Sequence, residues 1–168
     1  MTGSGDFVPP PLAPLGDGHD ITHFDSGEPS LDSWLREHAV RTGRRHLSAT
    51  HVWTQPDGRV VAYVTLTAAS IARDDLPKAI GHGFPDTIPA TLLGRLALDK
   101  QLHGQGLGGV LLAEALSIAA QVAASIAAAF VVVDALNEKA AEFYLHYGFT
   151  RLPGTNRLVL KVATIASA

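Results

Sequence analysis

The sequence predicts an α+β fold in which a mixed, mostly antiparallel sheet is flanked by helices. Two β-rich runs at 49–54 and 60–67 are joined by the turn residues 56–58, a combination typical of a β-hairpin. The run at 130–134 is short, continuous and apolar, as expected of a buried central strand. A glycine-rich segment at 103–109 lies between an expected strand and an expected helix.

The remaining elements follow from proline, glycine and apolar spacing. Pro29 and Ser30 open a helix, and Gly43 either ends it or separates two short helices. The segment 69–90 is irregular and is interpreted either as a substrate loop or as a plain surface excursion. We expect a strand at 91–98, helices at 107–120 and 137–147, and closing strands at 149–152 and 158–162.

The composition favours one compact domain. With 168 residues, 46% hydrophobic and 17% charged, the chain can build a core. Residues 1–18 are rich in proline and glycine and are expected to form a flexible tail, with a short strand near 12–15, ahead of a domain at 19–168. The absence of cysteine excludes disulfides, thiolate metal sites and a cysteine nucleophile. The lack of cysteine fits a protein of the reducing cytoplasm. No signal peptide is expected, and the apolar stretch 111–133 is interpreted as a helix and a strand rather than a membrane span.

Charge is distributed unevenly along a chain whose net charge is −3. Residues 1–35 hold six acids and no lysine or arginine. Between residues 36 and 59 there are five arginines against two acids. This stretch is either a basic binding patch or an ordinary solvated helix face.

The glycine-rich segment has the chemistry of an anion site. Glycines let backbone N–H groups approach a phosphate closely, and a helix that begins just afterwards adds unpaired amides and a positive dipole end. The spacing of Gly104, Gly106 and Gly109 also matches a dinucleotide fingerprint, although little chain follows for a doubly wound domain. A third interpretation is a purely structural strand-to-helix turn.

Two motifs resemble the GNAT acetyltransferase superfamily, whose pyrophosphate loop runs Arg/Gln-x-x-Gly-x-Gly/Ala. The run from His103 to Gly108 follows that pattern, with histidine replacing the usual first residue. About 30 residues later, Asn137-x-x-Ala140-x-x-Phe143-Tyr144-x-x-x-Gly148-Phe149 is similar to the family's closing helix and strand. The resemblance implies a GNAT fold with a splayed strand pair, near 96–98 and 130–134, that holds acetyl-coenzyme A.

The resemblance also implies roles for individual residues. Tyr144 is the catalytic candidate, because a positioned phenol can protonate the thiolate that leaves during aminolysis of a thioester. Its alternative role is that of a packed aromatic on an amphipathic helix. Asn137 is expected to bind the cofactor, to cap the helix, or both. The cofactor-binding residues implied in this way are Leu96, Ala97, Leu98, His103, Gly104, Gln105, Gly106, Leu107, Gly108, Gly109 and Asn137.

Within the superfamily, the chain resembles one branch more closely than the others, namely the tRNA-acetylating toxins of bacterial toxin–antitoxin pairs. The residues concerned are Phe24-Asp25-Ser26-Gly27-Glu28-Pro29-x-Leu31-Asp32-x-Trp34-Leu35 and Leu92-Leu93-Gly94-Arg95-Leu96-Ala97-Leu98-Asp99, with Ser26 where the branch usually has cysteine. This resemblance implies acetylation of the α-amino group of aminoacyl-tRNA, which blocks translation. The expected tRNA-binding residues are Arg36, Arg41, Arg44, Arg45 and Arg95.

The resemblance to these toxins also implies partners. It implies a homodimer neutralised by a ribbon-helix-helix antitoxin, with no membrane partner. The alternatives are a GNAT enzyme that acts on a small amine or a protein N-terminus, and a non-catalytic module that binds coenzyme A. The general base stays open among His82, Asp99 and water. No metal site is expected, because His19 and His23 lie in a segment without a helix signal.

Overall fold

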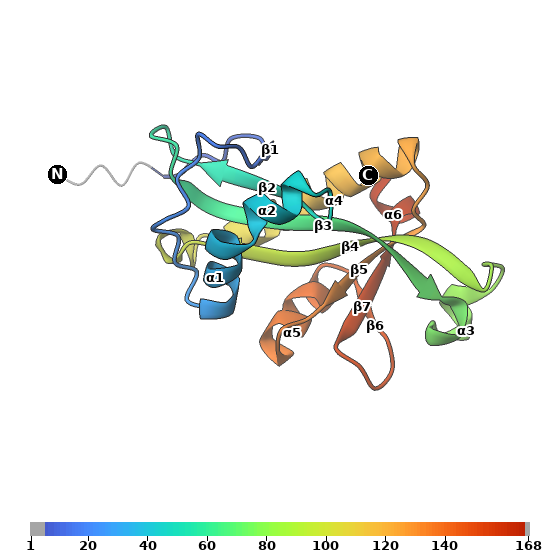
Figure 1. The fold of residues 1–168 in the computed structure, drawn as a ribbon. Helices are drawn as coiled ribbons and strands as arrows, with labels where there is room; N and C mark the ends of the chain where they lie inside the picture. The colour runs from blue at the N-terminus through green and yellow to red at the C-terminus, as the bar shows by residue number, and fades with distance from the viewer. Residues whose placement is uncertain (1–5, 167–168) are drawn as a thin grey trace. The chain divides into compact units, whose positions relative to one another are not determined.

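The structure is a computed structural model that describes residues 6–166 (Figure 1). Its backbone divides into two compact units, each built from two stretches of chain. Unit 1 comprises Met1–Thr65 and Arg95–Glu114, and unit 2 comprises Leu66–Gly94 and Ala115–Ala168. The strand order is β1-β2-β3-β4-β5-β7-β6 in one seven-stranded sheet.

Two strands and one helix run from one unit into the other. These are β3, β4 and α4. The elements in chain order are β1 (Ala13–Pro14), α1 (Pro29–Glu37), α2 (Ala39–Arg44), β2 (Ala49–Thr54), β3 (Val60–Ala72), the 3-10 turn η1 (Arg73–Asp75), α3 (Lys78–Gly81), β4 (Thr87–Leu98), the 3-10 turn η2 (Lys100–Leu102), α4 (Leu107–Ser125), β5 (Phe130–Asp134), α5 (Glu138–His146), β6 (Thr150–Arg151), β7 (Arg157–Lys161) and α6 (Val162–Ala166).

Unit 1 is built around the expected hairpin of β2 and the first part of β3. The Pro56–Gly58 turn is present, and Gly58 adopts a φ of 89° that favours glycine. The short strand β1 pairs with β2 in antiparallel register, which confirms the strand expected near residues 12–15. Helices α1 and α2, in blue in Figure 1, pack on the hairpin through a core that includes Leu35 and Tyr63. This core gives α1 a fixed position on the sheet.

The start of α1 depends on a buried aspartate. Pro29 is the first helical residue as expected, but Ser30 is not the cap, because Glu28 holds that position without a side-chain bond. Instead, the buried Asp32 carboxylate accepts the Ser26 backbone N–H at 3.0 Å and the Ser26 hydroxyl at 2.7 Å. The expected break at Gly43 is also wrong. The helical conformation is interrupted between α1 and α2 at His38, where φ is −125° and ψ is −28°.

Helix α4 is five residues longer than expected and buries one stripe of its surface. Leu107, Leu111, Leu112, Ala115 and Ala119 are buried, a spacing that recurs on one helical face. Its 19 residues are apolar enough, by length and composition alone, to cross a membrane. The core helix of a globular domain passes the same test, and the buried stripe is the pattern of such a helix.

In unit 2, the expectation of an irregular segment over the whole of 69–90 is wrong. Strand β3 continues to Ala72 and β4 already begins at Thr87, so the connection is shorter and contains η1 and α3. The glycines and prolines that suggested a loop are concentrated in this connection, whereas Ile71 and Ile88 are buried strand residues. They pack with Leu76 and Phe130 in one apolar cluster. Pro89 is accommodated within β4.

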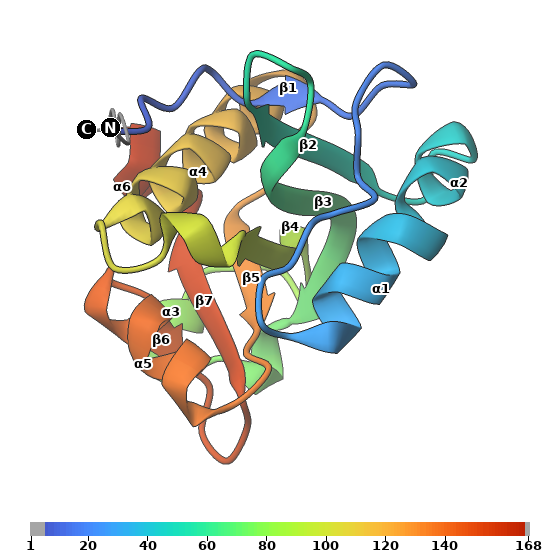
Figure 2. The same cartoon turned by 90° about the vertical axis from the view of Figure 1, so that its left-hand side faces the viewer.

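The end of unit 2 matches the sequence closely. Strand β5 occupies the expected residues and pairs in parallel with β4 at Ala90–Leu92 and in antiparallel with β7, so the sheet is mixed. The pairing of β4 with β5 stops at Leu92, although β4 continues to Leu98. Figure 2 shows α5, in orange, beside β6 and β7. Two ion pairs stabilise this region, Arg157 with Asp134 at 2.8 Å and Arg151 with Glu138 at 3.0 Å.

Replacement of Asp32 by alanine is expected to destabilise the protein. It leaves the buried Ser26 N–H and hydroxyl without their acceptor, a loss of about 2 kcal/mol in free energy of unfolding. Urea denaturation of the variant measures the change. The control is Glu37→Ala on the exposed side of the same helix, with an expected change below about 0.5 kcal/mol. Equal effects of the two substitutions would show that the Ser26–Asp32 bonds add no stability.

Candidate active site

The glycine segment forms an open loop at the end of β4 in unit 1. Gly104 and Gly106 have φ values of 75° and 73°, in the left-handed region that favours glycine. A Cβ at either position would meet no atom within 4 Å. The backbone of this loop is therefore open to a ligand on the side that a side chain would cover.

The loop leads directly into α4, whose first turn contains two glycines and no acid. The backbone N–H groups of residues 104–109 form no hydrogen bond with the rest of the chain that the structure describes. Such free donors, together with the positive end of the helix dipole, suit a phosphate or pyrophosphate. The loop residues present thus fit the pyrophosphate of a nucleotide cofactor.

His103 stands at the position where the loop departs from the usual pattern. Its exposed ring donates from Nε2 to the Leu98 carbonyl at 2.9 Å. The histidine thus ties the loop back to the end of β4. Of the strand residues expected to line the cofactor, Ala97 is buried, whereas Leu96 and Leu98 are half-buried.

The base of the loop is fixed by a network that the sequence did not predict. Both oxygens of the Asp99 carboxylate accept backbone N–H groups, from Gln101 at 3.1 Å and from Asp25 at 3.1 Å. The Lys100 N–H donates to the Asp25 carbonyl at 2.8 Å, and its ammonium lies 3.5 Å from the Asp25 carboxylate. Asp99, a candidate base in the sequence, is thus a structural anchor of η2 and of the 25–27 turn.

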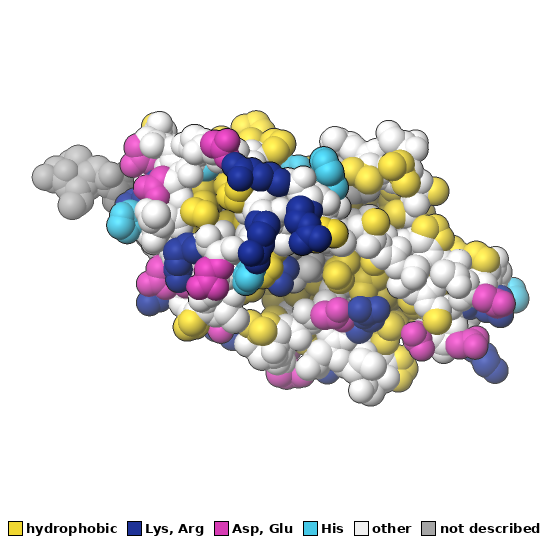
Figure 3. Space-filling model, in the orientation of Figure 1, with side chains coloured by type: hydrophobic (Ala, Val, Ile, Leu, Met, Phe, Trp, Pro, Cys, Tyr) yellow, Lys and Arg dark blue, Asp and Glu magenta, His cyan; other side chains and the backbone are white. Residues whose placement is uncertain are grey.

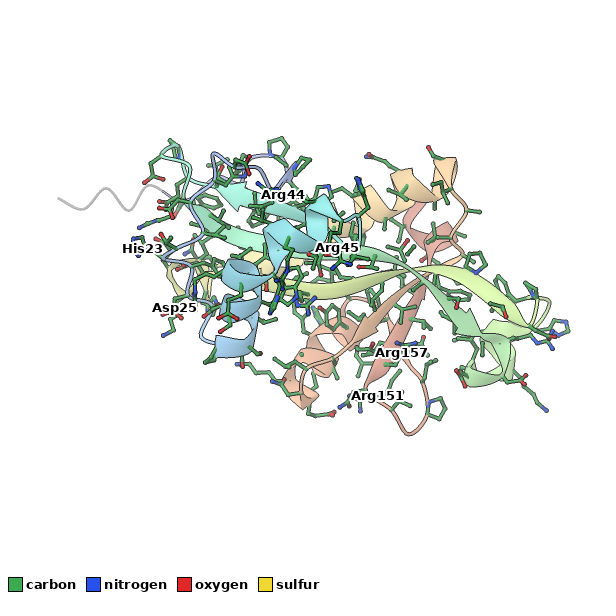
Figure 4. All side chains as sticks on the ribbon, in the orientation of Figure 1. His23, Asp25, Arg44, Arg45, Arg151 and Arg157 are labelled. Atoms are coloured by element: carbon green, nitrogen blue, oxygen red, sulfur yellow. The ribbon has the colours of Figure 1, made fainter. Side chains whose placement is uncertain are left out.

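The Asp25 side chain closes that turn. Its carboxylate accepts the Gly27 N–H at 3.0 Å, and this bond, with help from Lys100, holds the pKa of Asp25 below its usual value. Figure 4 shows Asp25 beside the chain segment that precedes α1. The motif Phe24–Asp32 therefore has a physical role, since its Asp25 end anchors the glycine loop and its Asp32 end anchors α1. The sequence held no local signal for this contact, because Asp25 and Asp99 are 74 positions apart.

Tyr144 lies on α5 in unit 2 with its ring buried between aromatic neighbours. The ring centroids of Phe143 and Phe149 are 5.2 Å and 5.4 Å away. The hydroxyl has no hydrogen-bond partner within the described residues, yet it is not among the polar atoms that are fully buried and unbonded. It therefore keeps some accessible surface. Burial raises the pKa of Tyr144 above its ordinary value, so the phenol holds its proton at neutral pH.

Asn137 caps the helix that carries Tyr144. Its side-chain oxygen accepts the Ala140 backbone N–H at 2.9 Å, which confirms the capping role among the two considered. Cofactor binding by the exposed amide group stays a prediction. His82, the other protein base considered, lies exposed in the connection between β3 and β4.

The arginines expected to bind tRNA divide into three kinds. Arg41, Arg44 and Arg45 are exposed along α2, where dark blue side chains gather in Figure 3 and two of them are labelled in Figure 4. Arg36, exposed on α1, donates to the Phe24 carbonyl at 3.3 Å. Arg95 is half-buried, with its guanidinium carbon 3.9 Å from the centre of a tryptophan ring. The first three alone form an exposed basic row, which we call the α2 patch.

A glycine loop at a helix N-terminus after a strand, a mixed sheet and a buried tyrosine on a late helix define an acyltransferase of the GNAT type. The chain belongs to this family, since residues 48–151 match the acetyltransferase (GNAT) domain. It is also 40% identical over 139 residues to the tRNA-acetylating toxin of Mycobacterium tuberculosis (strain ATCC 25618 / H37Rv), a match that spans 83% of each chain.

Solved structures show the same likeness. AtaT in complex with acetyl-methionyl-tRNAfMet superimposes with a TM-score of 0.86 and 32% identity, over 93% of this chain and 96% of that chain. A tyrosine-to-phenylalanine variant of AtaT, bound to the C-terminus of the antitoxin AtaR and to acetyl-CoA, gives a TM-score of 0.80 and 30% identity, over 93% and 95% of the two chains. These likenesses confirm the expected GNAT fold.

Replacement of Gly106 by alanine is expected to raise the KM for acetyl-CoA about tenfold. An L-residue in the left-handed region costs about 1–2 kcal/mol, which the loop relieves by leaving its binding conformation. Steady-state kinetics measures the change. The matched control is Gly154→Ala, which has a φ of 72° and equally open surroundings in the loop before β7. A similar rise in KM for both variants would mean that the glycine loop does not hold the cofactor.

Proposed function

We propose that this protein transfers an acetyl group from acetyl-CoA to the α-amino group of aminoacyl-tRNA and thereby blocks translation. The observation that carries the proposal is the 40% identity with a tRNA-acetylating toxin, because it extends over 83% of both chains. The likeness to AtaT, which is known in complex with acetyl-methionyl-tRNAfMet, supports the same acceptor. The anion-binding loop and the α2 patch supply the two phosphate-binding surfaces that such a reaction needs.

The cofactor is acetyl-CoA, which supplies an acyl group activated as a thioester. The free N–H groups at the start of α4 hold its pyrophosphate, and His103 and Gln105 border the same loop. We assign the pantetheine arm to the backbone of Leu96–Leu98. A backbone N–H near Ala97 stabilises the negative charge that develops on the carbonyl oxygen during transfer.

Tyr144 acts as the general acid. A neutral amine nitrogen forms the amide bond as the carbon–sulfur bond breaks, and the phenol donates its proton to the departing sulfur. The raised pKa keeps that proton available across the physiological range. Transfer is direct, since the chain has no cysteine and no covalent enzyme intermediate is required. The proton lost by the amine goes to water or to a base such as His82.

The α2 patch binds the tRNA backbone. Its arginines are exposed, and Arg44 makes only a 3.3 Å exposed pair with Asp17, an interaction that competes weakly with phosphate. Arg41 donates to His38 at 2.9 Å, and Arg45 has no partner within the described residues. Arg36, in the last turn of α1, is a further exposed candidate for a phosphate contact. Phosphate contacts of this kind supply affinity without sequence specificity.

The proposed activity implies a particular cellular setting. Charged tRNA is cytoplasmic, so we place the enzyme in the cytoplasm. An enzyme that arrests translation requires neutralisation, and the complex of AtaT with its antitoxin supports an antitoxin partner here. We further propose that this antitoxin is a ribbon-helix-helix protein and that the enzyme is a homodimer. A neighbouring reading frame that encodes a small protein of that class would support the first of these two assignments.

Tyr144→Phe is expected to lower kcat by about a hundredfold or more, because it removes the general acid. The hydroxyl has no hydrogen-bond partner within the described residues, so the free energy of unfolding should change by less than about 0.5 kcal/mol. Acetylation of charged tRNA and thermal unfolding measure the two effects. Tyr147→Phe, one turn on and exposed, is the matched control. An active Tyr144→Phe enzyme would refute the assigned role.

Simultaneous replacement of Arg41, Arg44 and Arg45 by glutamate is expected to raise the KM for charged tRNA and to leave the KM for acetyl-CoA unchanged. The negative slope of log affinity against log salt should become shallower by about 0.7–0.9 for each arginine that contacts a phosphate. The control reverses three exposed lysines outside the patch, Lys78, Lys139 and Lys161. Equal losses in the two triple variants would show that net charge, rather than the α2 patch, governs binding.

A further inference from the structure

Arg95 lies at the top of a stack of three side chains in unit 1. Its guanidinium carbon is 3.9 Å from the centre of the Trp34 ring. Trp34 in turn stacks on Tyr63, with ring centroids 6.1 Å apart and planes inclined by 12°. A cation over the face of tryptophan is attracted by the ring quadrupole, and the flat guanidinium keeps its N–H edge free.

The bottom of the stack is anchored firmly. Tyr63 is fully buried in the core, and its hydroxyl donates to the Leu31 carbonyl at 2.6 Å. An edge-on contact with Phe24, 5.5 Å between centroids, holds the ring from the side. Because Tyr63 cannot tilt, Trp34 and the guanidinium above it have a defined orientation. The stack therefore presents Arg95 at a fixed place on β4.

The Arg95 charge has no counter-charge within the described residues. Four other half-buried arginines, 59, 73, 151 and 157, each hydrogen-bond a side-chain or backbone oxygen. Arg95 makes no such bond, and burial lowers its pKa. Partial burial of a cation without a neighbouring anion costs free energy. A planar guanidinium whose N–H donors are free is suited to bidentate binding of a phosphate or carboxylate.

The position on β4 indicates which anion is bound. Residues two apart on a strand share a face, so Arg95 lies on the same face as Ala97, about 7 Å along the strand. A backbone N–H near Ala97 is the group to which we assign stabilisation of the reacting carbonyl. The anion of aminoacyl-tRNA that lies nearest to the esterified amino acid is the last phosphodiester, next to the terminal adenosine. The last phosphodiester is therefore the phosphate of the RNA that lies nearest to a cation beside the reacting strand.

We propose that Arg95, oriented by Trp34 and Tyr63, binds the last phosphodiester of aminoacyl-tRNA and so positions the amino acid for transfer. This assignment rests on the proposed function and adds a positioning contact at the acceptor end, distinct from the α2 patch. The α2 patch supplies general affinity for RNA, whereas Arg95 fixes the register of the 3′ end. The contact depends on the terminal linkage of the RNA and on no particular base.

The test compares two short RNA hairpins that end in unpaired CCA, one natural and one with a neutral methylphosphonate at the last linkage. Binding is measured by fluorescence anisotropy, without acetyl transfer. The wild-type protein is expected to bind the neutral-linkage RNA about tenfold more weakly. In Arg95→Gln the two RNAs should bind equally, and Arg95→Lys should keep part of the difference, because a point charge replaces the fork. Trp34→Leu removes the ring that supports the guanidinium but keeps the charge, and it should also reduce the difference in affinity between the two RNAs.

Kinetics adds a readout that a merely structural role would not produce. Arg95→Gln should raise the KM for charged tRNA about tenfold and leave the KM for acetyl-CoA unchanged. Arg59→Gln is the matched control, since Arg59 is a half-buried arginine of the same unit that is bonded to Gln55. If the wild type and Arg95→Gln show the same penalty for the neutral linkage, the assignment of Arg95 is wrong. If the wild type binds neither RNA, the proposed acceptor is wrong and the assignment fails with it.

Discussion

The backbone N–H groups of residues 104–109, in the glycine loop and the first turn of α4, must be kept free of internal acceptors, and several contacts in unit 1 serve this constraint. Two glycines with positive φ hold the loop in a conformation that other residues adopt only with strain. Asp99 fixes the turn before the loop by accepting two backbone N–H groups, and His103 ties the loop to the end of β4. The donors are thus oriented before a ligand arrives, which reduces the conformational cost of binding.

The two units supply different chemical groups. Unit 1 contains the glycine loop, the α2 patch and the Arg95 stack, all of which suit negatively charged groups. Unit 2 contains Tyr144, a neutral proton donor in an apolar setting of Phe143 and Phe149. Burial suits this function, because desolvation opposes the charged phenolate and so keeps the proton on the oxygen. Phosphate binding and proton donation thus need opposite surroundings, polar and open in the first case and apolar in the second.

The sequence predicted the elements that have strong local signals. The strand at 130–134, the hairpin turn and the glycine loop were correctly placed, because apolar runs and turn residues are local properties. The break at His38 and the length of β3 were missed, since both depend on packing against the sheet rather than on a breaker residue. The Asp99–Asp25 network and the Trp34–Arg95 stack were also missed. Each joins residues more than 60 positions apart, and a single sequence does not reveal such contacts.

The most direct measurement is incubation of the protein with labelled acetyl-CoA and total charged tRNA, followed by mass spectrometry of the released aminoacyl groups. If the protein is an aminoacyl-tRNA acetyltransferase, the label will appear on the α-amino group of one or more amino acids, and only when the tRNA is charged. Label confined to free small amines or to protein N-termini, with none on aminoacyl groups, would contradict the proposed acceptor.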